Sequence, residues 1–447
     1  MLVDFKQKSA RGRFFYTFIM VKLYRINKSL VDIMDSRLSE HFIFAAGKSL
    51  SAVDAVPSRS NQHEIGGLVK VGFGDAIGNI KSGEKLQIPC LMVWLSDDDD
   101  NHLITTTVTW YDARAGKAYR APEYRLYYPS NEVTERIGEG DFLLAALRHN
   151  NELVICFAPK HSQIEWQLRS LFGLATGDDP DNRFHGAELS DKKLLLPIRM
   201  FLEEIGIIFE SEVDPQDATL EWLLSLYPDG FPTSKDFSKL ARERVGRHSV
   251  GAPDETLMAW LEEEERLFRV MERHIVRQQL LEGFGAEKDN VDAFIQYSLS
   301  VHNRRKSRVG FAFENHIETV FKEHGLFFEK GSRRNVTENN SKPDFLFPSF
   351  SAYHEKEYSS DKLFLLAAKT TCKDRWRQVL AEAARIPKKH LITLQSLISA
   401  NQLEEMRYHQ LQLVIPSPVL SLYSNDSQDF LMPLSEFIDV VQSANLS

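Results

Sequence analysis

"LFLLAAKTTCKDRWRQVLAEAARIP", residues 363–387, is the stretch that decides the fold of the C-terminal half of the chain. It begins as an apolar run of the length of a buried strand, and this run ends on Lys369. Because side chains alternate between the two faces of a strand, Lys369 shares a face with Leu363, Leu365 and Ala367. It emerges at the carboxyl end of the strand, where open α/β sheets place their sites. The stretch therefore predicts a buried strand that delivers a lysine to a site.

The residues after this strand predict a basic helix with two distinct faces. Helical spacing joins its apolar residues in one stripe, which comprises Trp376, Val379, Leu380 and Ala383. A different face would carry Arg375, Gln378, Glu382 and Arg385. Glu382 is therefore expected to project from this helix, near the end of the strand that bears Lys369.

Further strands and helices alternate around this stretch. Besides the strand at 363–369, strands are expected over 344–348, 390–394 and 411–416. Helices are expected between the strands at 363–369, 390–394 and 411–416. Upstream, helical periodicity covers 196–209, 219–227, 255–282 and 311–325. Strands that alternate with helices predict an α/β fold with a central sheet flanked by helices.

The N-terminal part has a different character. Short β-branched and aromatic runs, separated by turn signals, occupy 103–112, 123–129, 141–147 and 152–159. Regular short strands predict a β-rich barrel or sandwich of about 140 residues. A helix is expected over 164–174, and the Asp-, Gly- and Pro-rich residues that follow it resemble a linker. The predicted organisation is an extension (1–34), a β-rich domain (35–174), a linker (175–192) and an α/β domain (193–447).

Composition limits the class of protein. The chain has 447 residues, of which 43% are hydrophobic and 26% charged, as in soluble globular proteins. Its three cysteines are far apart and fit neither a disulfide framework nor a metal motif, so a reducing, cytoplasmic compartment is expected. The apolar run near the N-terminus is short, is interrupted by Lys22 and lacks a small-residue cleavage site. We expect residues 1–34 to be a disordered or alternatively initiated extension.

The charge is unevenly distributed. The whole chain carries a formal net charge of −9, yet residues 301–390 hold 18 Lys and Arg against 11 Asp and Glu. A basic segment on an acidic protein is expected where one face approaches a polyanion. Arg304 and Arg305 are candidate phosphate contacts. A solvated surface patch is the alternative interpretation.

An aspartate precedes the lysine of the decisive strand. In KPDFLFP, Asp344 begins a strand 25 residues before Lys369. Metal-dependent phosphodiester hydrolysis needs this pair, since a carboxylate holds Mg²⁺ and a lysine orients and polarises the attacking water. Glu382 could supply a second carboxylate and Glu314 a third. A turn aspartate and a surface lysine are the alternative.

Several segments together resemble a known family. KSRVGFAFENHIETVF, TENNSKPDFLFPS, AAKTTCKDRWRQVLAEAARIPKKHLITL and NQLEEMRYHQLQLVIP are similar to the catalytic domain of EcoRII-type restriction endonucleases of the PD-(D/E)XK superfamily, over about residues 255–440. The resemblance implies a type IIE enzyme with Asp344, Lys369 and Glu382 at its active site, and with Asp344 and Glu382 as Mg²⁺ ligands. It makes Glu314 an accessory carboxylate and Tyr353 a catalytic tyrosine, although a packing role for Tyr353 is equally open.

The same resemblance assigns Lys373, Asp374 and Arg375 to base reading. Lys and Arg donate to the major-groove edge of guanine, and a carboxylate accepts from cytosine N4, so this run could read a G·C pair. Asp374 could instead be a carboxylate that stabilises the N-terminus of a helix. Trp376 and Cys372 are expected to be packing residues.

The N-terminal part resembles the effector domain of this family, a DNA-binding pseudobarrel shared with plant transcription factors. The matching segments include GKSLSAVDAVPSRSNQHEIGG (47–67) and EYRLYYPSNEV. The resemblance implies two DNA-contacting loop arms, which comprise Lys48, Ser49, Asn61 and His63 on the first arm and Arg120, Glu123 and Arg125 on the second. For His63 and Glu123, an ordinary exposed loop position is the alternative.

The leading functional hypothesis is a sequence-specific, Mg²⁺-dependent DNA endonuclease. The resemblance implies a CC(A/T)GG-like pseudopalindrome, a second copy of the site bound by the effector domain, a homodimer and a cognate DNA methyltransferase in the same host. The alternative is a DNA-binding regulator that retains an inactive nuclease fold. The presence of Asp344, Lys369 and Glu382 together favours the enzyme. An RNA or repair nuclease would not be expected to carry a base-reading run beside its catalytic lysine.

Overall fold

The structure is a computed structural model. It describes residues 37–55, 63–97, 101–116, 119–175, 182–187, 189, 194–204, 218–372, 375–396, 398–423 and 428–446. The chain divides into two compact units, which we describe separately. The helical unit contains the described residues within 210–248 and 256–319, and the sheet unit contains those within 37–209, 249–255 and 320–447. The predicted extension 1–34 and most of the predicted linker 175–192 lie outside the described residues, and the predicted domain boundaries stay a prediction.

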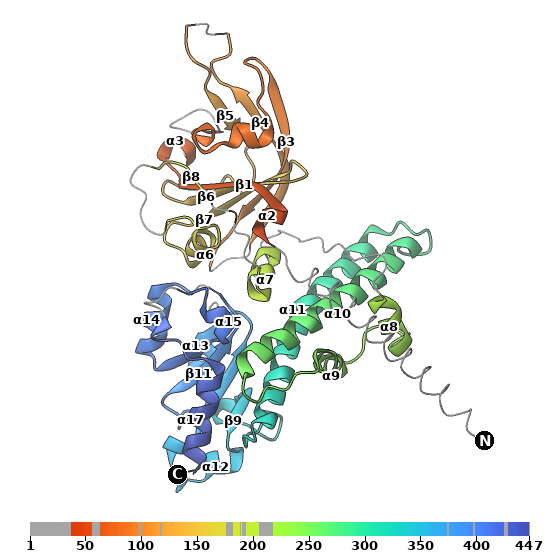
Figure 1. The fold of residues 1–447 in the computed structure, drawn as a ribbon, viewed down its shortest axis with the longest axis vertical. Coiled ribbons are helices and arrows are strands. Elements are labelled where there is room, and N and C mark those ends of the chain that lie inside the picture. The colour runs from red at the N-terminus through yellow and green to blue at the C-terminus, as the bar shows by residue number, and fades with distance from the viewer. Residues whose placement is uncertain are drawn as a thin grey trace, which may run out of the picture. The chain divides into compact units, whose positions relative to one another are not determined.

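The first sheet of the sheet unit has eight strands (Figure 1). In sheet order they are β2 (Glu64–Ile65), β5 (Tyr124–Tyr127), β4 (His102–Asp112), β3 (Lys85–Trp94), β7 (Leu153–Ala158), β6 (Phe142–Arg148), β1 (Phe42–Ser49) and β8 (His185–Gly186). All neighbours are antiparallel except β3 and β7, which are parallel. The strands predicted over 103–112, 123–129, 141–147 and 152–159 are therefore confirmed.

Both faces of the central strands of this sheet are buried. Every residue of β7 is buried, so this strand is a continuous apolar run, as strands covered on both faces are. One face packs against α5 (Phe73–Ile77), with Phe73 against Trp110 at a ring-centroid distance of 5.0 Å. The other face packs against α6 (Gln163–Leu171) and α7 (Leu196–Glu204), whose Ile198 and Leu202 lie in the same apolar cluster as Phe142. Helix α7 is thus part of the core of the first sheet.

Short helices and one predicted helix complete this part of the chain. α2 (Leu38–His41), α3 (Ala52–Ala55) and the 3-10 helix η1 (Leu68–Val71) lie between its strands. α6 begins where the Ser162 hydroxyl accepts a hydrogen bond from the backbone N–H of Glu165 at 3.1 Å, an N-cap contact. The chain leaves the helix at Gly173, whose φ of 63° is in the left-handed region that glycine adopts without strain. The predicted helix over 164–174 is confirmed.

The second sheet is mixed and has four strands. Its order is β12 (Leu411–Val414), β11 (Lys389–Thr393), β10 (Phe364–Lys369) and β9 (Phe345–Phe347). β10, β11 and β12 are parallel, and β9 is antiparallel to β10. α13 (Arg375–Leu380) and α14 (Ala400–Tyr408) are the crossovers between the parallel strands. The predicted α/β sheet with flanking helices is confirmed for this part of the chain.

Other helices cover this second sheet. They are α12 (Phe350–His354), α15 (Ser417–Leu420) and α17 (Leu434–Leu446), with the 3-10 helices η2 (Glu338–Asn340) and η3 (Ser360–Lys362) in the connections. Phe437 of α17 packs against Phe347 of β9 and His390 of β11, with ring centroids 5.7 and 5.0 Å away. This packing buries the sheet face beneath α17.

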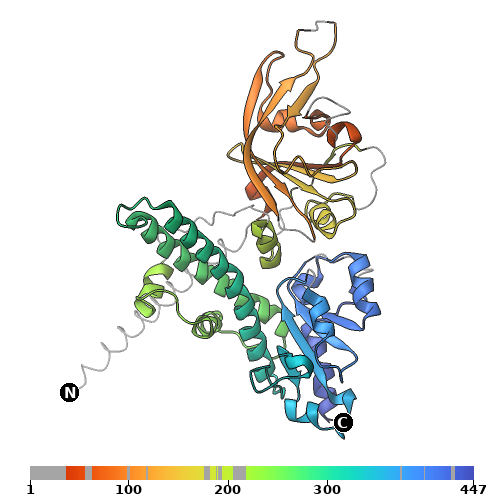
Figure 2. The ribbon, with the colours of Figure 1, turned by 180° about the vertical axis from the view of Figure 1, so that it is seen from behind.

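The helical unit is built around two long helices that run side by side (Figure 2). α10 (Pro253–Glu282) and α11 (Val291–Glu323) accompany α8 (Thr219–Leu226) and α9 (Ser234–Val245). α11 has 33 residues, so the helix predicted over 311–325 is only its C-terminal part. Within the described residues, none of the helices has the length and apolar content needed to span a membrane.

Candidate active site at the end of strand β10

Asp344 and Lys369 meet at one end of the second sheet. Asp344 directly precedes β9, and Lys369 is the last residue of β10. Because the two strands are antiparallel, with Phe345 opposite Leu366, the beginning of β9 lies beside the end of β10. One carboxylate oxygen of Asp344, Oδ2, accepts hydrogen bonds from Lys369 Nζ and from the backbone N–H of Ala368, both at 2.8 Å. The structure therefore brings the predicted pair into direct contact.

This pair is open enough to meet a substrate. The side chains of Asp344 and Lys369 are 19% and 26% exposed, whereas residues 345–347 of β9 and 365–368 of β10 are buried. The backbone hydrogen bond from Ala368 fixes the orientation of the carboxylate. A charged pair at the rim of a buried sheet is thus held in place without being sealed from solvent.

Glu382 lies close to this pair, in a different local structure from the one expected. The predicted helix face carrying Glu382 is wrong, because α13 ends at Leu380 and Glu382 lies in the loop that follows. Burial and, to a lesser extent, the neighbouring charge of Asp344 raise the pKa of Glu382 to about 7, against the opposing effect of Lys369. Two carboxylates and one lysine therefore share a single electrostatic environment.

Three backbone features explain why the helix stops. Ala383 is fully buried and has a φ of 46°, which is incompatible with a continued right-handed helix. The backbone N–H of Ala384 donates to Glu338 Oε2 at 3.1 Å, and that of Arg385 donates to the hydroxyl of Tyr353 at 3.3 Å. The N–H groups that would extend the helix are thus bonded to side chains from other segments.

Tyr353 does not lie free in the site. It is 1% exposed on α12, and its hydroxyl donates to the Glu338 carboxylate, with both oxygens at 2.7 Å. Burial raises the pKa of Tyr353 to about 12, with a further contribution from its hydrogen bond to Glu338. Partial burial raises the pKa of Glu338, but hydrogen bonds from Tyr353 and from backbone N–H groups outweigh this effect and lower it. Glu338 was not predicted as a site residue, because its contact with Tyr353, 15 residues later, exists only in the folded chain.

The remaining predicted catalytic carboxylate belongs to the other unit. Glu314 is half-buried on α11 in the helical unit, whereas Asp344, Lys369 and Glu382 lie in the sheet unit. Its accessory role stays a prediction.

The predicted base-reading run begins at Lys373, four residues after Lys369. Lys373, Asp374 and the side chain of Arg375 lie outside the described residues. The segment before them is held by Gln395, whose side-chain oxygen accepts from the backbone N–H of Cys372. The hydroxyl of Tyr423 donates to the backbone carbonyl of Gln395 at 2.6 Å. Cys372 and Trp376 are fully buried, as expected for packing residues.

A divalent cation fits the donor set of this site. Among the described residues, no group of three or more His, Cys, Asp or Glu side chains is placed to hold a metal ion. Mg²⁺, however, is usually held by one or two carboxylates together with water and substrate phosphate oxygens. Asp344 and Glu382 supply two carboxylates whose mutual repulsion a cation would relieve. A closed all-protein metal site, by contrast, does not fit.

The basic segment 301–390 is partly neutralised within the helical unit. Arg305 bonds to the buried carboxylate of Glu272 at 2.7 Å, and Arg308 pairs with Glu265. Arg304 lies over the ring of Phe231 at 4.9 Å. Both Arg304 and Arg305 are half-buried, and their role as phosphate contacts stays a prediction. Their cationic charge serves contacts between helices as well as the surface.

On the predicted first effector arm, two side chains are buried. Lys48 is 4% exposed and bonds to Asp54 Oδ2 at 2.8 Å, and Ser49 accepts from the guanidinium of Arg169 at 3.0 Å. Asn61 lies outside the described residues, and the ring of His63 packs edge-on against Tyr128. The structure thus engages Lys48 and Ser49 in internal contacts, and their DNA contacts stay a prediction.

On the predicted second arm, the residues are more accessible. Arg120 is exposed, with its guanidinium over the ring of exposed Tyr119 at 5.5 Å. Glu123 is half-buried and bonds to Arg125 at 2.7 Å, which is the main cause of its lowered pKa. Arg125 also bonds to Glu64 at 2.8 Å, so β5 and β2 are linked by charge.

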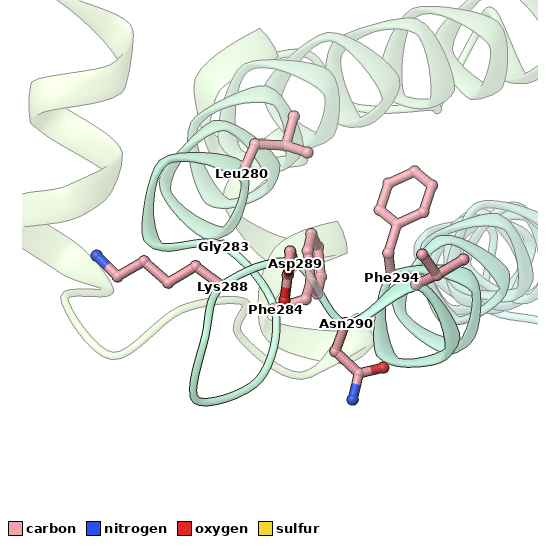
Figure 3. A pocket seen from close by; sticks show the side chains of 8 residues that line it. Leu280, Gly283, Phe284, Lys288, Asp289, Asn290 and Phe294 are labelled. Carbon is pink, nitrogen blue, oxygen red and sulfur yellow. The ribbon is translucent and has the colours of Figure 1, made fainter.

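A separate pocket lies at the tip of the α10–α11 hairpin. Figure 3 shows its lining, and its volume is about 310 Å³. The lining residues are Leu280, Gly283, Phe284, Lys288, Asp289, Asn290, Val291 and Phe294. None of them is a predicted site residue.

Comparisons with known proteins give matches to restriction enzymes. Residues 268–438 match the family described as "EcoRII C terminal". A curated relative, the type II restriction enzyme EcoRII of Escherichia coli, is 42% identical over 208 residues. This alignment covers 46% of the present chain and 50% of the relative, so the chain spans about half the length of the relative it matches.

Solved structures give more distant matches. A metal-depleted complex of Ecl18kI with uncleaved DNA aligns at 16% identity and a TM-score of 0.40, over 52% of this chain and 85% of that one. A PspGI–substrate DNA complex aligns at 16% identity and a TM-score of 0.39, over 48% of this chain and 95% of that one. A further match, to the B3 domain of UbaLAI restriction endonuclease with cognate DNA, has 14% identity and a TM-score of 0.21, over 36% of this chain and 98% of that one. The C-terminal part of this chain, over residues 268–438, is thus similar to the EcoRII C-terminal family of restriction endonucleases.

Proposed function

We propose that this protein is a type II restriction endonuclease that hydrolyses phosphodiester bonds of double-stranded DNA at a short, CCWGG-like pseudopalindrome. The observation that carries the proposal is the contact between Lys369 Nζ and Asp344 Oδ2 at 2.8 Å, with Glu382 in the same electrostatic environment. The match of residues 268–438 to the EcoRII C-terminal family and the 42% identity to a restriction enzyme over 208 residues support it.

The three residues have distinct roles in the proposed reaction. Asp344 and Glu382 would hold Mg²⁺, which when bound polarises the scissile phosphate and stabilises the charge that develops on it. The backbone N–H of Ala368 keeps the Asp344 carboxylate in one orientation. The Lys369 ammonium can donate to the attacking water or to a non-bridging phosphate oxygen, which aligns the water for in-line attack.

Glu382 has a second property that matters for the reaction. With its pKa at about 7, this carboxyl group is only partly ionised near neutral pH in the protein alone. A divalent cation favours the ionised form, so Glu382 would gain its full charge when metal and DNA assemble at the site.

Sequence recognition is proposed to lie next to the chemistry. Lys373, Asp374 and Arg375 follow Lys369 within six residues, and this short separation would link base reading to the position of the catalytic lysine. Arg and Lys would contact guanine, and Asp374 would accept from cytosine.

The N-terminal sheet is proposed to form an effector domain, a pseudobarrel that binds a second copy of the site. His63, Arg120, Glu123 and Arg125 are its candidate contacts, with Asn61. Lys48 and Ser49, being buried, would contact DNA only after a local rearrangement. A homodimer, which a palindromic target favours, and a cognate DNA methyltransferase in the same host complete the proposal.

The test is a digestion with a matched control. The purified protein is incubated with a plasmid that contains several CCWGG copies, with Mg²⁺ or with EDTA, and the products are separated by electrophoresis. Discrete fragments that require Mg²⁺ are expected, and Lys369→Ala should yield none. Specific binding without cleavage by the wild type would instead indicate a DNA-binding regulator with an inactive nuclease fold.

A further inference from the structure

Tyr353 is connected to the loop that carries Glu382, and its contacts lead away from the Asp344–Lys369 pair. Its hydroxyl donates to Glu338 at 2.7 Å and accepts from the backbone N–H of Arg385 at 3.3 Å. The same Glu338 carboxylate accepts from the backbone N–H of Ala384 at 3.1 Å. Glu338 and Tyr353 therefore hold two successive N–H groups of the loop that follows α13.

Arg385 binds the loop to the α12 segment from the other side. Its guanidinium donates to three backbone carbonyls, those of Tyr353, Glu355 at 2.9 Å and Tyr358 at 2.8 Å. It also lies over the ring of Tyr353, 5.7 Å from the centroid. Loop 381–386 is thus attached to residues 338 and 353–358 through both its backbone and one of its side chains.

The position of the loop depends on these contacts. The helix ends at Leu380, and Ala383 adopts a φ of 46°, a conformation that is unfavourable for alanine unless the surroundings impose it. The loop sequence LAEAAR would favour a continued helix, because alanine, leucine, glutamate and arginine are strong helix formers. A continued α-helix would bond the backbone N–H of Glu382 to the carbonyl of Gln378, whereas it donates to the carbonyl of Val379 at 3.1 Å. Glu338, Tyr353 and Arg385 supply the contacts that oppose this.

We propose that Glu338, Tyr353 and Arg385 form a clamp that positions Glu382 for metal binding, and that Tyr353 is a positioning residue and takes no part in the chemical step. The inference rests on the proposed function, since it assigns Glu382 as a ligand. The role of Glu338 follows from its contacts with Tyr353 and Ala384 in the folded chain. A tyrosine whose hydroxyl is fully engaged by a carboxylate and a backbone N–H is not available to a phosphate or a water.

Tyr353→Phe and Glu338→Gln test the clamp with small changes. Tyr353→Phe keeps the buried ring and removes the hydroxyl, and Glu338→Gln keeps the size of the side chain and removes its charge. We expect each variant to raise the Mg²⁺ concentration for half-maximal cleavage about tenfold, the effect of losing one charge-assisted hydrogen bond. The rate at saturating Mg²⁺ should recover to within threefold of wild type. The double variant should be no worse than the worse single variant, because both changes release the same loop.

Two further measurements do not depend on cleavage. Mn²⁺ binding to the protein, followed by electron paramagnetic resonance, should weaken about tenfold in both variants. Hydrogen exchange at the amides of Ala384 and Arg385 should accelerate in both. If the wild type cleaves nothing, these two readouts still decide whether the clamp positions a metal ligand.

Val441→Ala is the matched control. Val441 is fully buried on α17, and its truncation destabilises the same part of the fold without touching the clamp. It should leave Mn²⁺ affinity and Mg²⁺ half-saturation at wild-type values. The proposal is overturned if Tyr353→Phe lowers the rate at saturating Mg²⁺ at least 100-fold with unchanged half-saturation, since the hydroxyl would then act in the chemistry. It is also overturned if Val441→Ala weakens Mn²⁺ binding as much as Glu338→Gln does.

Discussion

Replacement of Asp344 separates the chemistry of the proposed site from its contribution to folding. In the structure, Asp344 Oδ2 has two hydrogen-bond donors, Lys369 Nζ and the backbone N–H of Ala368, both at 2.8 Å. Asp344→Ala removes the carboxylate and both contacts. Asp344→Asn removes the charge and keeps an amide oxygen that can still accept from Ala368.

The structure allows the cost of each change to be worked out. The partly exposed ion pair with Lys369 contributes about 1 kcal/mol to stability. The hydrogen bond from Ala368 contributes about 1 kcal/mol more. Asp344→Ala should therefore lower the free energy of unfolding by about 2 kcal/mol, out of the roughly 5–15 kcal/mol typical of a folded domain. Asp344→Asn should lower it by about 1 kcal/mol.

The cost to cleavage is much larger. A metal ligand that stabilises the transition state contributes several kcal/mol, and each 1.36 kcal/mol corresponds to a factor of ten in rate. Both variants should lose cleavage by at least about 10³-fold at saturating Mg²⁺. Initial rates on a supercoiled plasmid and urea unfolding curves of the same preparations measure the two quantities. Cleavage by folded Asp344→Asn within tenfold of wild type would refute the assignment of Asp344 as a ligand.

Three further outcomes are expected from other parts of the chain. Arg375→Ala should weaken binding to the specific site by about 1–3 kcal/mol and leave non-specific binding nearly unchanged in competition gel shifts, and an equal loss for all sequences would mean a phosphate contact instead. Burial, reinforced by the nearby charge of Lys388, lowers the pKa of His390 to about 4. Between about pH 6.5 and 4, His390 therefore binds a proton in the unfolded chain but not in the folded chain. The free energy of unfolding should therefore fall by up to about 3 kcal/mol as the pH drops through that window. In urea unfolding, His390→Phe should show a weaker dependence of this free energy on pH. The same pH dependence in the variant and the wild type would contradict this. Separate expression of residues 218–447 should give a folded fragment that cleaves DNA, and a folded fragment that cuts neither one-site nor two-site DNA would show that the N-terminal part completes the active site.

The fragment begins at residue 218 because of α7. The predicted α/β domain begins at residue 193, but Ile198 and Leu202 pack in the apolar cluster of the first sheet. A fragment that begins at residue 193 would expose these side chains. Starting at Ala218 leaves α7 with the sheet that buries it.

The central part of the candidate site could be predicted because short-range rules govern it. Lys369 ends a buried strand, and Asp344 precedes another, so alternation and strand length suffice to place both at one end of a sheet. The structure then adds their hydrogen bond, which needs only that β9 and β10 are neighbours.

The loop after α13 could not be predicted from local sequence. The helical pattern of α13 continues through Ala381, Glu382, Ala383 and Ala384, and the intrinsic propensity of these residues favours a helix. Tertiary contacts from Glu338, more than 40 residues earlier in the chain, oppose that preference.

The partners of two cationic side chains could not be predicted either, for a similar reason. Lys48 is buried because Asp54, six residues later, folds back onto it. Arg305 is partly neutralised by Glu272 of α10, 33 residues earlier. Net charge along a sequence counts such groups as free, and only the packed structure shows which carboxylates they meet.

The central claim is that Asp344, Lys369 and Glu382 make this chain a site-specific, Mg²⁺-dependent DNA endonuclease. Sequencing of the ends that the protein produces from unmethylated genomic DNA tests it most directly, with Lys369→Ala as the parallel sample. We predict that the wild-type ends fall at one short pseudopalindrome containing C·G pairs, only when Mg²⁺ is present, and that Lys369→Ala produces no ends above background. Ends scattered without a common sequence, or an equal yield from Lys369→Ala, would contradict the account.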